Sequence, residues 1–348
     1  MKTHAADGRP FPTARRRQAR TALVVLALLA LFSIAAACAI GSLALSPADL
    51  AGAAVDLLHG HAATLAATLV ELRLDRALSA FVTGATLALA GVMMQALLRN
   101  PLAEPYVLGV SGGAAVGALA ALLLFAAPWT VDAAAFGGAI AVSMLLYALA
   151  RHDLRGAPAA EGSAPMLLLT GVILASGCSA LVALMLSIAP EGRLRGMVFW
   201  LIGDLSGSSA RWLPWLVLVG ALIFAMRKAR AINVMALHAD IAATLGVDAG
   251  ALRRGLFFCS ALLTASAVSN AGSIGFVGLI VPHACRLALG SDHRLLLPAA
   301  TLVGGAFLVL ADTLARSAIA PQQLPVGVIT AVIGVPVFLL QLHRQRRR

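Results

Sequence analysis

Side chains that could carry out chemistry are sparse in this sequence, and the clearest pair is Asp312 and Arg316. They lie four residues apart in an apolar run, the spacing at which an acid and a base on one helix can pair. An ionisable group inside a membrane segment is costly and usually functional, so a proton or sodium relay is one interpretation. One ion pair near a helix end is better explained as a structural or interface element.

Sequence motifs for catalysis and for nucleotide binding are missing. The only lysines are Lys2 and Lys228, and neither follows a glycine, so the chain has no Walker A phosphate loop. It has no HExxH motif, no paired carboxylates in its apolar runs and no nucleophile beside a base. We therefore expect no enzyme activity, no bound cofactor and no metal site. The energy for any transport should come from another polypeptide.

Cysteine and histidine add little to this interpretation. The four cysteines form no CxxC pair and three of them lie in apolar runs, so they are interpreted as small packing residues. His59 and His61 lie in a segment predicted to face outward, where imidazole could ligate an arriving haem iron. Exposed loop histidines without a ligand are the commoner explanation, so these two residues leave the cargo open.

The composition indicates an integral membrane protein that lies in a lipid bilayer. Of the 348 residues, 60% are hydrophobic and 12% are charged, and the mean hydropathy is +0.92. A soluble domain carries about 25% charged residues. The formal net charge of +11 comes from short basic clusters between apolar runs, not from a basic domain rich in aromatic residues. Nucleic acid is therefore not an expected partner.

Ten apolar runs approach the length of about 20 residues at which a helix crosses a bilayer. They predict an all-α integral membrane fold with about ten transmembrane helices in one domain, residues 21–342, between basic arms at 1–20 and 343–348. The run at 274–284 is weak and is counted as a short or broken helix, whereas the run at 197–205 is too short to span. The ten runs are 21–45, 77–98, 107–127, 133–150, 166–189, 212–226, 255–268, 274–284, 297–314 and 326–342.

The charges predict which side faces the cytoplasm. The basic cluster at 15–20 precedes a run too long for a signal peptide, which indicates an uncleaved first helix. With ten crossings and both termini in the cytoplasm, most basic residues lie inside, as the positive-inside rule requires. The expected location is therefore the bacterial inner membrane. Only six of the 26 lysines and arginines then lie at or beyond the outer face: Arg73, Arg76, Arg193, Arg195, Arg211 and Arg316.

Small residues recur at helical spacing within the apolar runs. Gly109, Gly113 and Gly117 follow one another at intervals of four, and so do Gly84 and Ala88. Small residues at this spacing let two helix backbones approach closely in a membrane. The pattern predicts tight helix packing and says nothing about a substrate.

The longest predicted cytoplasmic connection, residues 227–254, is where another polypeptide could bind and drive transport. Residues 240–246 read Asp-Ile-Ala-Ala-Thr-Leu-Gly, with small and apolar residues at helical spacing before a glycine. This predicts a short helix that ends at Gly246 in the left-handed conformation. An ordinary amphipathic interfacial helix fits the same spacing.

Seven blocks, taken in order, resemble the FecCD-type family, the permeases of ABC importers for iron-siderophores, haem and cobalamin. The similarity covers about residues 72–340, most of the chain. A single block would be weak, but the ordered set is specific. The blocks are LRLDR at 72–76, GVMMQALLRNPLAEP at 91–105, LGVSG at 108–112, GFVGLIVPH at 275–283, SDHR at 291–294, LADTLAR at 310–316 and LPVGVIT at 324–330.

The resemblance implies the type II importer fold, a homodimer of ten-helix subunits with the translocation path at the dimer axis. It implies two cytoplasmic ABC ATPases, which bind ATP with magnesium, and a periplasmic substrate-binding protein. The implied cargo is an iron chelate, either haem or a ferric siderophore, with cobalamin as the alternative. An autonomous secondary carrier or channel is the alternative of another class, and the missing relay charges argue against it.

The resemblance also implies roles for particular residues. Segment 240–246 looks like the family's ATPase-coupling element, with aspartate in place of the usual glutamate. Arginines at the outer face of the family dock the binding protein, and Asp75 stands here where the family usually has proline. The coupling residues would be Asp240, Ala242, Ala243 and Gly246, and the docking residues Arg73, Arg76 and Arg316.

A cytoplasmic gate is implied after the second predicted helix. Pro101 breaks that helix, so a simple turn and a gate are compatible interpretations. The connection before the fifth predicted helix would supply a second gate element, although its match to the family is poorer. The gate and pathway residues would be Gln95, Asn100, Pro101, Leu102, Ser163 and Ala164.

Overall fold

The apolar runs of the sequence form helices. The computed structural model describes residues 13–41, 43–59, 64–124, 127–151, 154, 163–205, 212–237, 245–319 and 322–346. These residues form twelve α-helices, one 3₁₀ helix and no β-strand. Each of the ten predicted runs overlaps one of the helices, which confirms the all-α class. The helices are α1 (Thr13–Ala39), α2 (Pro47–Leu58), α3 (Leu65–Leu98), η1 (Pro105–Leu108), α4 (Val110–Leu124), α5 (Pro128–Leu149), α7 (Ser163–Ile188), α8 (Glu191–Ile202), α9 (Trp212–Leu237), α11 (Ala249–Ala271), α12 (Val277–Leu289), α13 (His293–Ser317) and α14 (Val326–Arg346).

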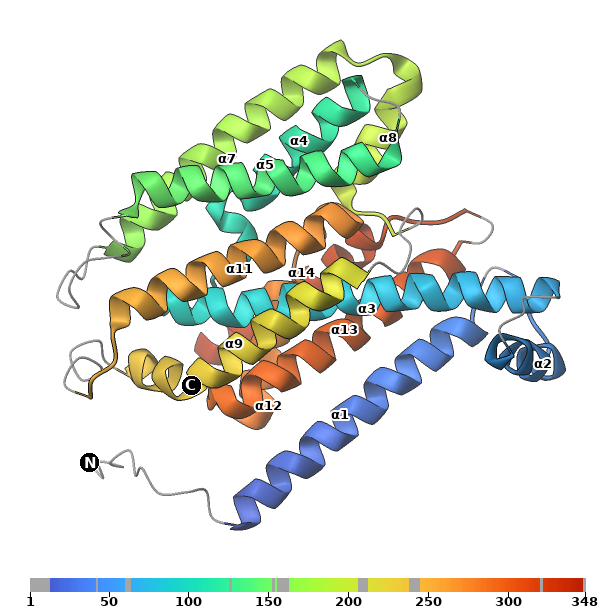
Figure 1. Ribbon diagram of the computed structural model, residues 1–348, viewed down its shortest axis with the longest axis horizontal. Coiled ribbons are helices and arrows are strands. Elements are labelled where there is room, and N and C mark those ends of the chain that lie inside the picture. Colours follow the sequence, from blue (N-terminus) through green and yellow to red (C-terminus); the bar gives the residue numbers. More distant parts are fainter. Residues whose placement is uncertain are drawn as a thin grey trace.

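Helix α3 is the central helix of the bundle (Figure 1). It contacts α1, α2, α9, α11, α12 and α13. A second group, α4, α5 and α7, packs onto the first through α11, which contacts both α3 and α5. Every residue of α3 from Ser79 to Leu98 is buried. This position explains why that part of the sequence is apolar on all sides.

Helix α3 begins at Leu65, whereas the predicted run begins at residue 77. Thr64 caps the helix, because its side-chain oxygen accepts a hydrogen bond from the backbone N–H of Ala67 at 3.1 Å. The charged segment 72–76 is therefore helical and continuous with the apolar run. The prediction was wrong at this boundary because the arginines of the segment have partners elsewhere in the chain.

Six of the described helices are long and apolar enough to cross a membrane, namely α1, α3, α5, α7, α11 and α13. Three further apolar helices, α4, α12 and α14, are shorter. The weak run at 274–284 is one of these short helices, as predicted. Ten crossings are not confirmed by these lengths, and the number stays a prediction.

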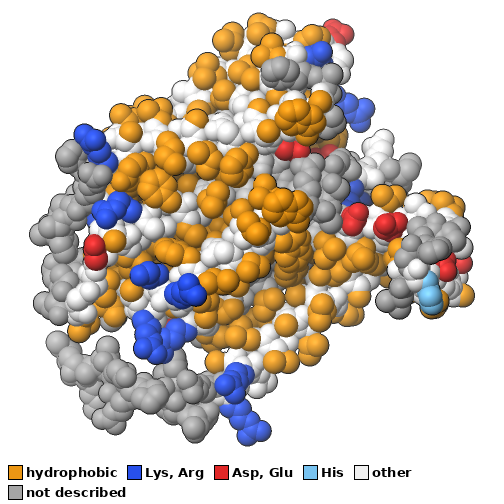
Figure 2. All heavy atoms as spheres, viewed as in Figure 1, with side chains coloured by type: hydrophobic (Ala, Val, Ile, Leu, Met, Phe, Trp, Pro, Cys, Tyr) orange, Lys and Arg blue, Asp and Glu red, His pale blue; other side chains and the backbone are white. Residues whose placement is uncertain are grey.

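The surface is apolar over much of its area. Large hydrophobic side chains such as Leu28, Phe32 and Ile173 are more than half exposed. Figure 2 shows hydrophobic side chains over much of the drawn face, with most of the Lys and Arg side chains toward its left. An exposed apolar area of this kind marks contact with lipid or with another protein.

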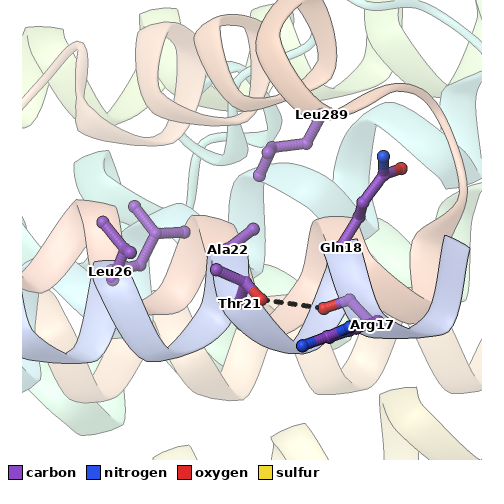
Figure 3. A pocket seen from close by; sticks show the side chains of 7 residues that line it. Arg17, Gln18, Thr21, Ala22, Leu26 and Leu289 are labelled. Atoms are coloured by element: carbon purple, nitrogen blue, oxygen red, sulfur yellow. Dashed lines mark hydrogen bonds between the residues drawn. The ribbon is translucent and has the colours of Figure 1, made fainter. Parts of the chain in front are cut away.

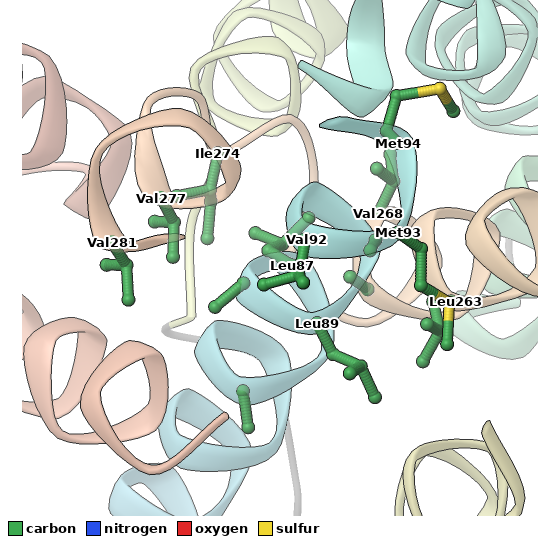
Figure 4. Close-up of a cluster of buried hydrophobic side chains, with 14 of the residues drawn as sticks. Leu87, Leu89, Val92, Met93, Met94, Leu263, Val268, Ile274, Val277 and Val281 are labelled. Carbon is green, nitrogen blue, oxygen red and sulfur yellow. The ribbon is translucent and has the colours of Figure 1, made fainter. Parts of the chain in front are cut away.

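The central core joins α3 to α11 and α12 (Figure 4). Met93 and Leu263 are fully buried, and Val281 is 3% exposed. Glycines let the backbones approach here. A Cβ at Gly91 would lie under 3.0 Å from three backbone atoms of Gly278. Close backbone approach also occurs between Gly84 and Gly304, Gly113 and Gly138, and Gly117 and Ala134, so the tight packing predicted from spacing is confirmed.

Candidate functional site

Two of the three arginines predicted to dock a partner lie inside the protein. Arg73 is 7% exposed and Arg316 is 6% exposed. Arg73 donates hydrogen bonds to the carbonyl oxygens of Cys38 and Ala39 at 3.1 and 3.2 Å, and Arg316 donates to the carbonyl of Ala37. The last carbonyls of a helix have no partner in their own helix. Both arginines therefore cap the C-terminal end of α1.

The third arginine, Arg76, forms a bidentate ion pair with Asp312. Its Nε and Nη2 lie 2.9 and 2.8 Å from the two carboxylate oxygens, the geometry in which arginine binds a carboxylate most strongly. Arg316 Nε is farther away, 3.6 Å from Asp312 Oδ2. The pair of Asp312 and Arg316 predicted from their spacing is therefore present, and Arg76 from another helix is the closer partner. Arg76 also donates to the side-chain oxygen of Gln323 at 2.8 Å.

The arginine cluster, Arg73, Arg76, Asp312 and Arg316, is largely buried, whereas the docking role implied for its arginines needs them at the surface. The side chain of Arg76 is 13% exposed, so it still reaches the surface. Asp75 is half-buried. The arginines are buried because they satisfy helix-end carbonyls and one carboxylate. A docking role for them stays a prediction.

The gate residues at the other end of α3 form a turn. Asn100 accepts a hydrogen bond from the backbone N–H of Leu102 at 2.9 Å, and Pro101 lies inside that turn. Gln95 is buried, and its side-chain oxygen accepts from Arg286 Nη2 at 2.9 Å. Leu102 is 41% exposed. The turn predicted from Asn100 and Pro101 is therefore present, whereas its action as a gate is a prediction.

A cavity of about 650 Å³ opens beside this turn. Its lining includes Gln95, Pro101, Asn233 and Arg286. Asn233 Oδ1 accepts the backbone N–H of His293 at 2.9 Å and lies 2.7 Å from the His293 ring nitrogen Nδ1. Asn233 therefore joins α9 to the start of α13, and the bond between Gln95 and Arg286 joins α3 to α12.

The second predicted gate element is only partly described. Ser163 and Ala164 are the first residues of α7, but their side chains lie outside the described part of the chain. Residues 155–162, which precede them, lie outside it as well. The role of Ser163 and Ala164 therefore stays a prediction.

Two hydrogen bonds near the turn at Asn100 and Pro101 have no counterpart among the predictions. Glu104 accepts a hydrogen bond from the backbone N–H of Phe276 at 2.9 Å, and Tyr106 accepts from that of Ile274 at 3.2 Å. Phe276 has a φ of 71°, which is uncommon for a bulky residue and marks a local constraint. Burial raises the pKa of the Glu104 carboxyl above its ordinary value, and the bond from Phe276 opposes the shift.

These contacts hold the connection between α3 and α4 against the break between α11 and α12. The sequence signal for this contact was Glu104, which is followed by Pro105 inside a largely apolar stretch. It indicates a buried acid, but not the backbone group that the acid binds. The bond between Glu104 and Phe276 therefore links the segment that follows α3 to the break between α11 and α12.

The predicted coupling segment is described only at its end. Asp240, Ala242 and Ala243 lie outside the described residues. Gly246 is exposed and has a φ of 73°, the left-handed conformation expected of it. Asp248 then caps α11, with its side chain accepting from Ala251 N at 2.8 Å. Gly246 therefore sets the direction in which the chain enters α11.

The described histidines and cysteines are not grouped in a way that could hold a metal ion. His59 is exposed, and its Nδ1 lies 2.8 Å from the carbonyl oxygen of Val55 in its own helix, whereas His61 lies outside the described residues. Within the described ranges, no group of three or more His, Cys, Asp or Glu residues could hold a metal ion.

Comparison with known proteins gives one family over nearly the whole chain. The model of the FecCD transport family matches residues 26–344. A cobalamin import system permease protein, BtuC, of Halobacterium salinarum is 43% identical over 287 residues, which are 80% of this chain and 73% of that protein. The vitamin B12 import system permease BtuC of Escherichia coli is 39% identical over 282 residues, 80% of this chain and 84% of that one.

A solved structure shares the fold. It is described as an inward-facing conformation of an ABC transporter assigned to the metal-chelate type. The two chains superpose with a TM-score of 0.80 at 30% identity, over 92% of this chain and 98% of that one.

Proposed function

The chain belongs to the FecCD transport family and is an ABC importer permease of that type, and we propose that its cargo is cobalamin or a closely related corrinoid. The observation that carries this proposal is the identity of 43% and 39%, over 80% of the chain, to permeases named for cobalamin import. An iron chelate, the cargo that the sequence motifs favoured, is the second candidate. It is favoured by the solved relative described as a metal-chelate transporter.

The partners belong to the same proposal. The functional unit would be a homodimer with two cytoplasmic ATPases, which bind ATP with magnesium, and a periplasmic binding protein. The location would be the bacterial inner membrane with both termini in the cytoplasm. The positive-inside rule supports this orientation, because most basic residues then face the cytoplasm. An autonomous carrier or channel does not fit a member of this family.

The cargo and the energy source can be tested together. The permease would be reconstituted in liposomes with its ATPase and binding protein, and uptake of labelled cobalamin, haem and a ferric siderophore measured. We expect cobalamin to accumulate only when both partners and ATP are present. Uptake of an iron chelate alone would support the second candidate. Equal uptake without the ATPase would contradict the importer mechanism.

Gly246→Pro is expected to abolish ATP-driven uptake while the protein still inserts. Proline holds φ near −65°, whereas Gly246 has a φ of 73°, so the direction of the coupling segment must change. A Cβ at Gly246 would have no heavy atom within 4 Å. Gly246→Asn is therefore a matched control, because asparagine tolerates the left-handed conformation. The measurement is uptake together with ATPase activity, and normal coupled uptake by the proline variant would refute the coupling role.

Reversing two outer charges, Arg73→Glu with Arg76→Glu, is expected to slow association of the binding protein about tenfold at low salt, as loss of electrostatic steering does. The same change removes the bonds by which Arg73 caps α1, so damage to the fold must be separated from loss of charge. Asp312→Asn disturbs the same cluster but keeps both arginines. Association rates and thermal stability would be measured for both variants. If the two slow equally, the arginines are structural and do not dock the partner.

A further inference from the structure

A basic cavity of about 690 Å³ lies between the beginning of α1 and the neighbouring parts of α9, α12 and α13. Four arginines line it, Arg20 from α1, Arg227 and Arg230 from α9, and Arg294 from the first turn of α13. Arg20, Arg227 and Arg230 are exposed, and Arg294 is half-buried. Arginines from three separate helices therefore face one space.

Among the residues that the structure describes, Asp292 is the one acid that lines this cavity. Its Oδ1 accepts a hydrogen bond from Asn233 Nδ2 at 2.8 Å and another from the backbone N–H of Arg294 at 3.0 Å. The carboxylate is thus engaged in holding the start of α13. The described lining therefore keeps an excess of positive charge and is complementary to an anion.

An apolar groove continues from the basic cavity along α1 (Figure 3). This second space of about 720 Å³ is lined on the α1 side by the polar residues Arg17, Gln18 and Thr21 and then by the apolar residues Ala22, Val25 and Leu26. Leu289 of α12 lies across from α1. Ala22 and Leu289 line both spaces, so the groove and the basic cavity adjoin. An occupant that fits both must combine a negative head with an apolar chain.

The position along the helices agrees with the depth of lipid head groups. Arg20 comes directly before the apolar run of α1, and Arg227 and Arg230 follow the apolar part of α9. Basic residues at such boundaries lie at the membrane interface.

We propose that this composite site binds one anionic phospholipid, with the phosphate among the four arginines and an acyl chain in the groove beside α1. The planar guanidinium group matches phosphate oxygens in pairs, and basic pockets between transmembrane helices bind anionic head groups. The groove distinguishes the lipid from a soluble phosphate, which would leave it empty.

The test is lipid retention by the purified full-length protein, measured by native mass spectrometry in mixtures of phosphatidylglycerol and phosphatidylcholine. Arg227→Gln with Arg230→Gln is expected to weaken phosphatidylglycerol binding about 25-fold, since about 1 kcal/mol per basic residue at an anionic surface is about fivefold each. The matched control is Arg151→Gln with Lys228→Gln. It removes the same charge from exposed residues, neither of which lines the cavity.

Two further measurements identify the occupant. Ala22→Trp should fill the groove and weaken lipid retention without changing any charge. Inorganic phosphate should compete poorly with phosphatidylglycerol. The proposal is overturned if the control pair loses as much lipid as the arginine pair, if the arginine pair retains the lipid, or if inorganic phosphate competes as well as the lipid does.

Discussion

Gly91→Leu is expected to leave little folded protein in the membrane. Even the Cβ of alanine at this position would lie under 3.0 Å from the carbonyl oxygen, the carbonyl carbon and the Cα of Gly278. These are backbone atoms of α12 and cannot rotate away. Because overpacking a core by single methylenes costs about 1–3 kcal/mol, leucine should cost at least about 5 kcal/mol, comparable with the whole stability of many domains.

The matched control for this variant is Gly220→Leu. Gly220 also lies within an apolar helix, but a Cβ there would have no heavy atom within 4 Å, and the residue is exposed. The measurement is the yield of monodisperse protein in detergent and its thermal unfolding. We expect the control to match the parent protein. A well-folded Gly91→Leu variant would show that α3 and α12 can separate without loss of the bundle.

The sequence predicts the helices of this protein well because their signal is local. An apolar run of sufficient length can satisfy its backbone in a membrane only as a helix or a closed barrel, and glycine at four-residue spacing marks close packing. Even the weak run at 274–284 is correctly interpreted as short, since α12 is Val277–Leu289. The number of crossings is harder to predict, because α4, α12 and α14 are shorter than a full span.

The boundaries that the sequence misplaces depend on contacts between distant residues. The first predicted helix runs to residue 45, but α1 ends at Ala39, where Arg73 binds the exposed carbonyls. The predicted start of α3 at residue 77 excludes a charged segment that pairs with Asp312. Arg76 and Asp312 are 236 residues apart, so no local pattern could join them.

The features of the candidate site divide in the same way, into those encoded by local sequence and those that depend on distant residues. The turn at Asn100 and Pro101 and the left-handed Gly246 were predictable because each is encoded by its own residue type. The bond from Phe276 to Glu104 was not, because its donor is a backbone group in the break between α11 and α12. Backbone donors carry no signature in the sequence.

Asp312→Asn is expected to destabilise the protein by about 3–5 kcal/mol, the usual cost of removing one partner of a buried ion pair. Asp312 is 2% exposed and is the counter-ion of both Arg76 and Arg316. An asparagine keeps the shape and can still accept one hydrogen bond, but it leaves two arginine charges without their carboxylate. Arg316 would then repel Arg76, and the cap at the end of α1 would loosen with them.

The comparison that isolates this effect is Glu71→Gln, which removes one negative charge from an exposed residue of α3 in the same turns of that helix as Arg73 and Arg76. We expect that control to change the stability by less than about 0.5 kcal/mol, as exposed substitutions usually do, and Asp312→Asn to lower Tm by roughly 10 °C. Thermal unfolding in detergent would measure both. Equal Tm values for the two variants would mean that the arginines do not need their carboxylate, and the cluster would then be free to serve docking alone.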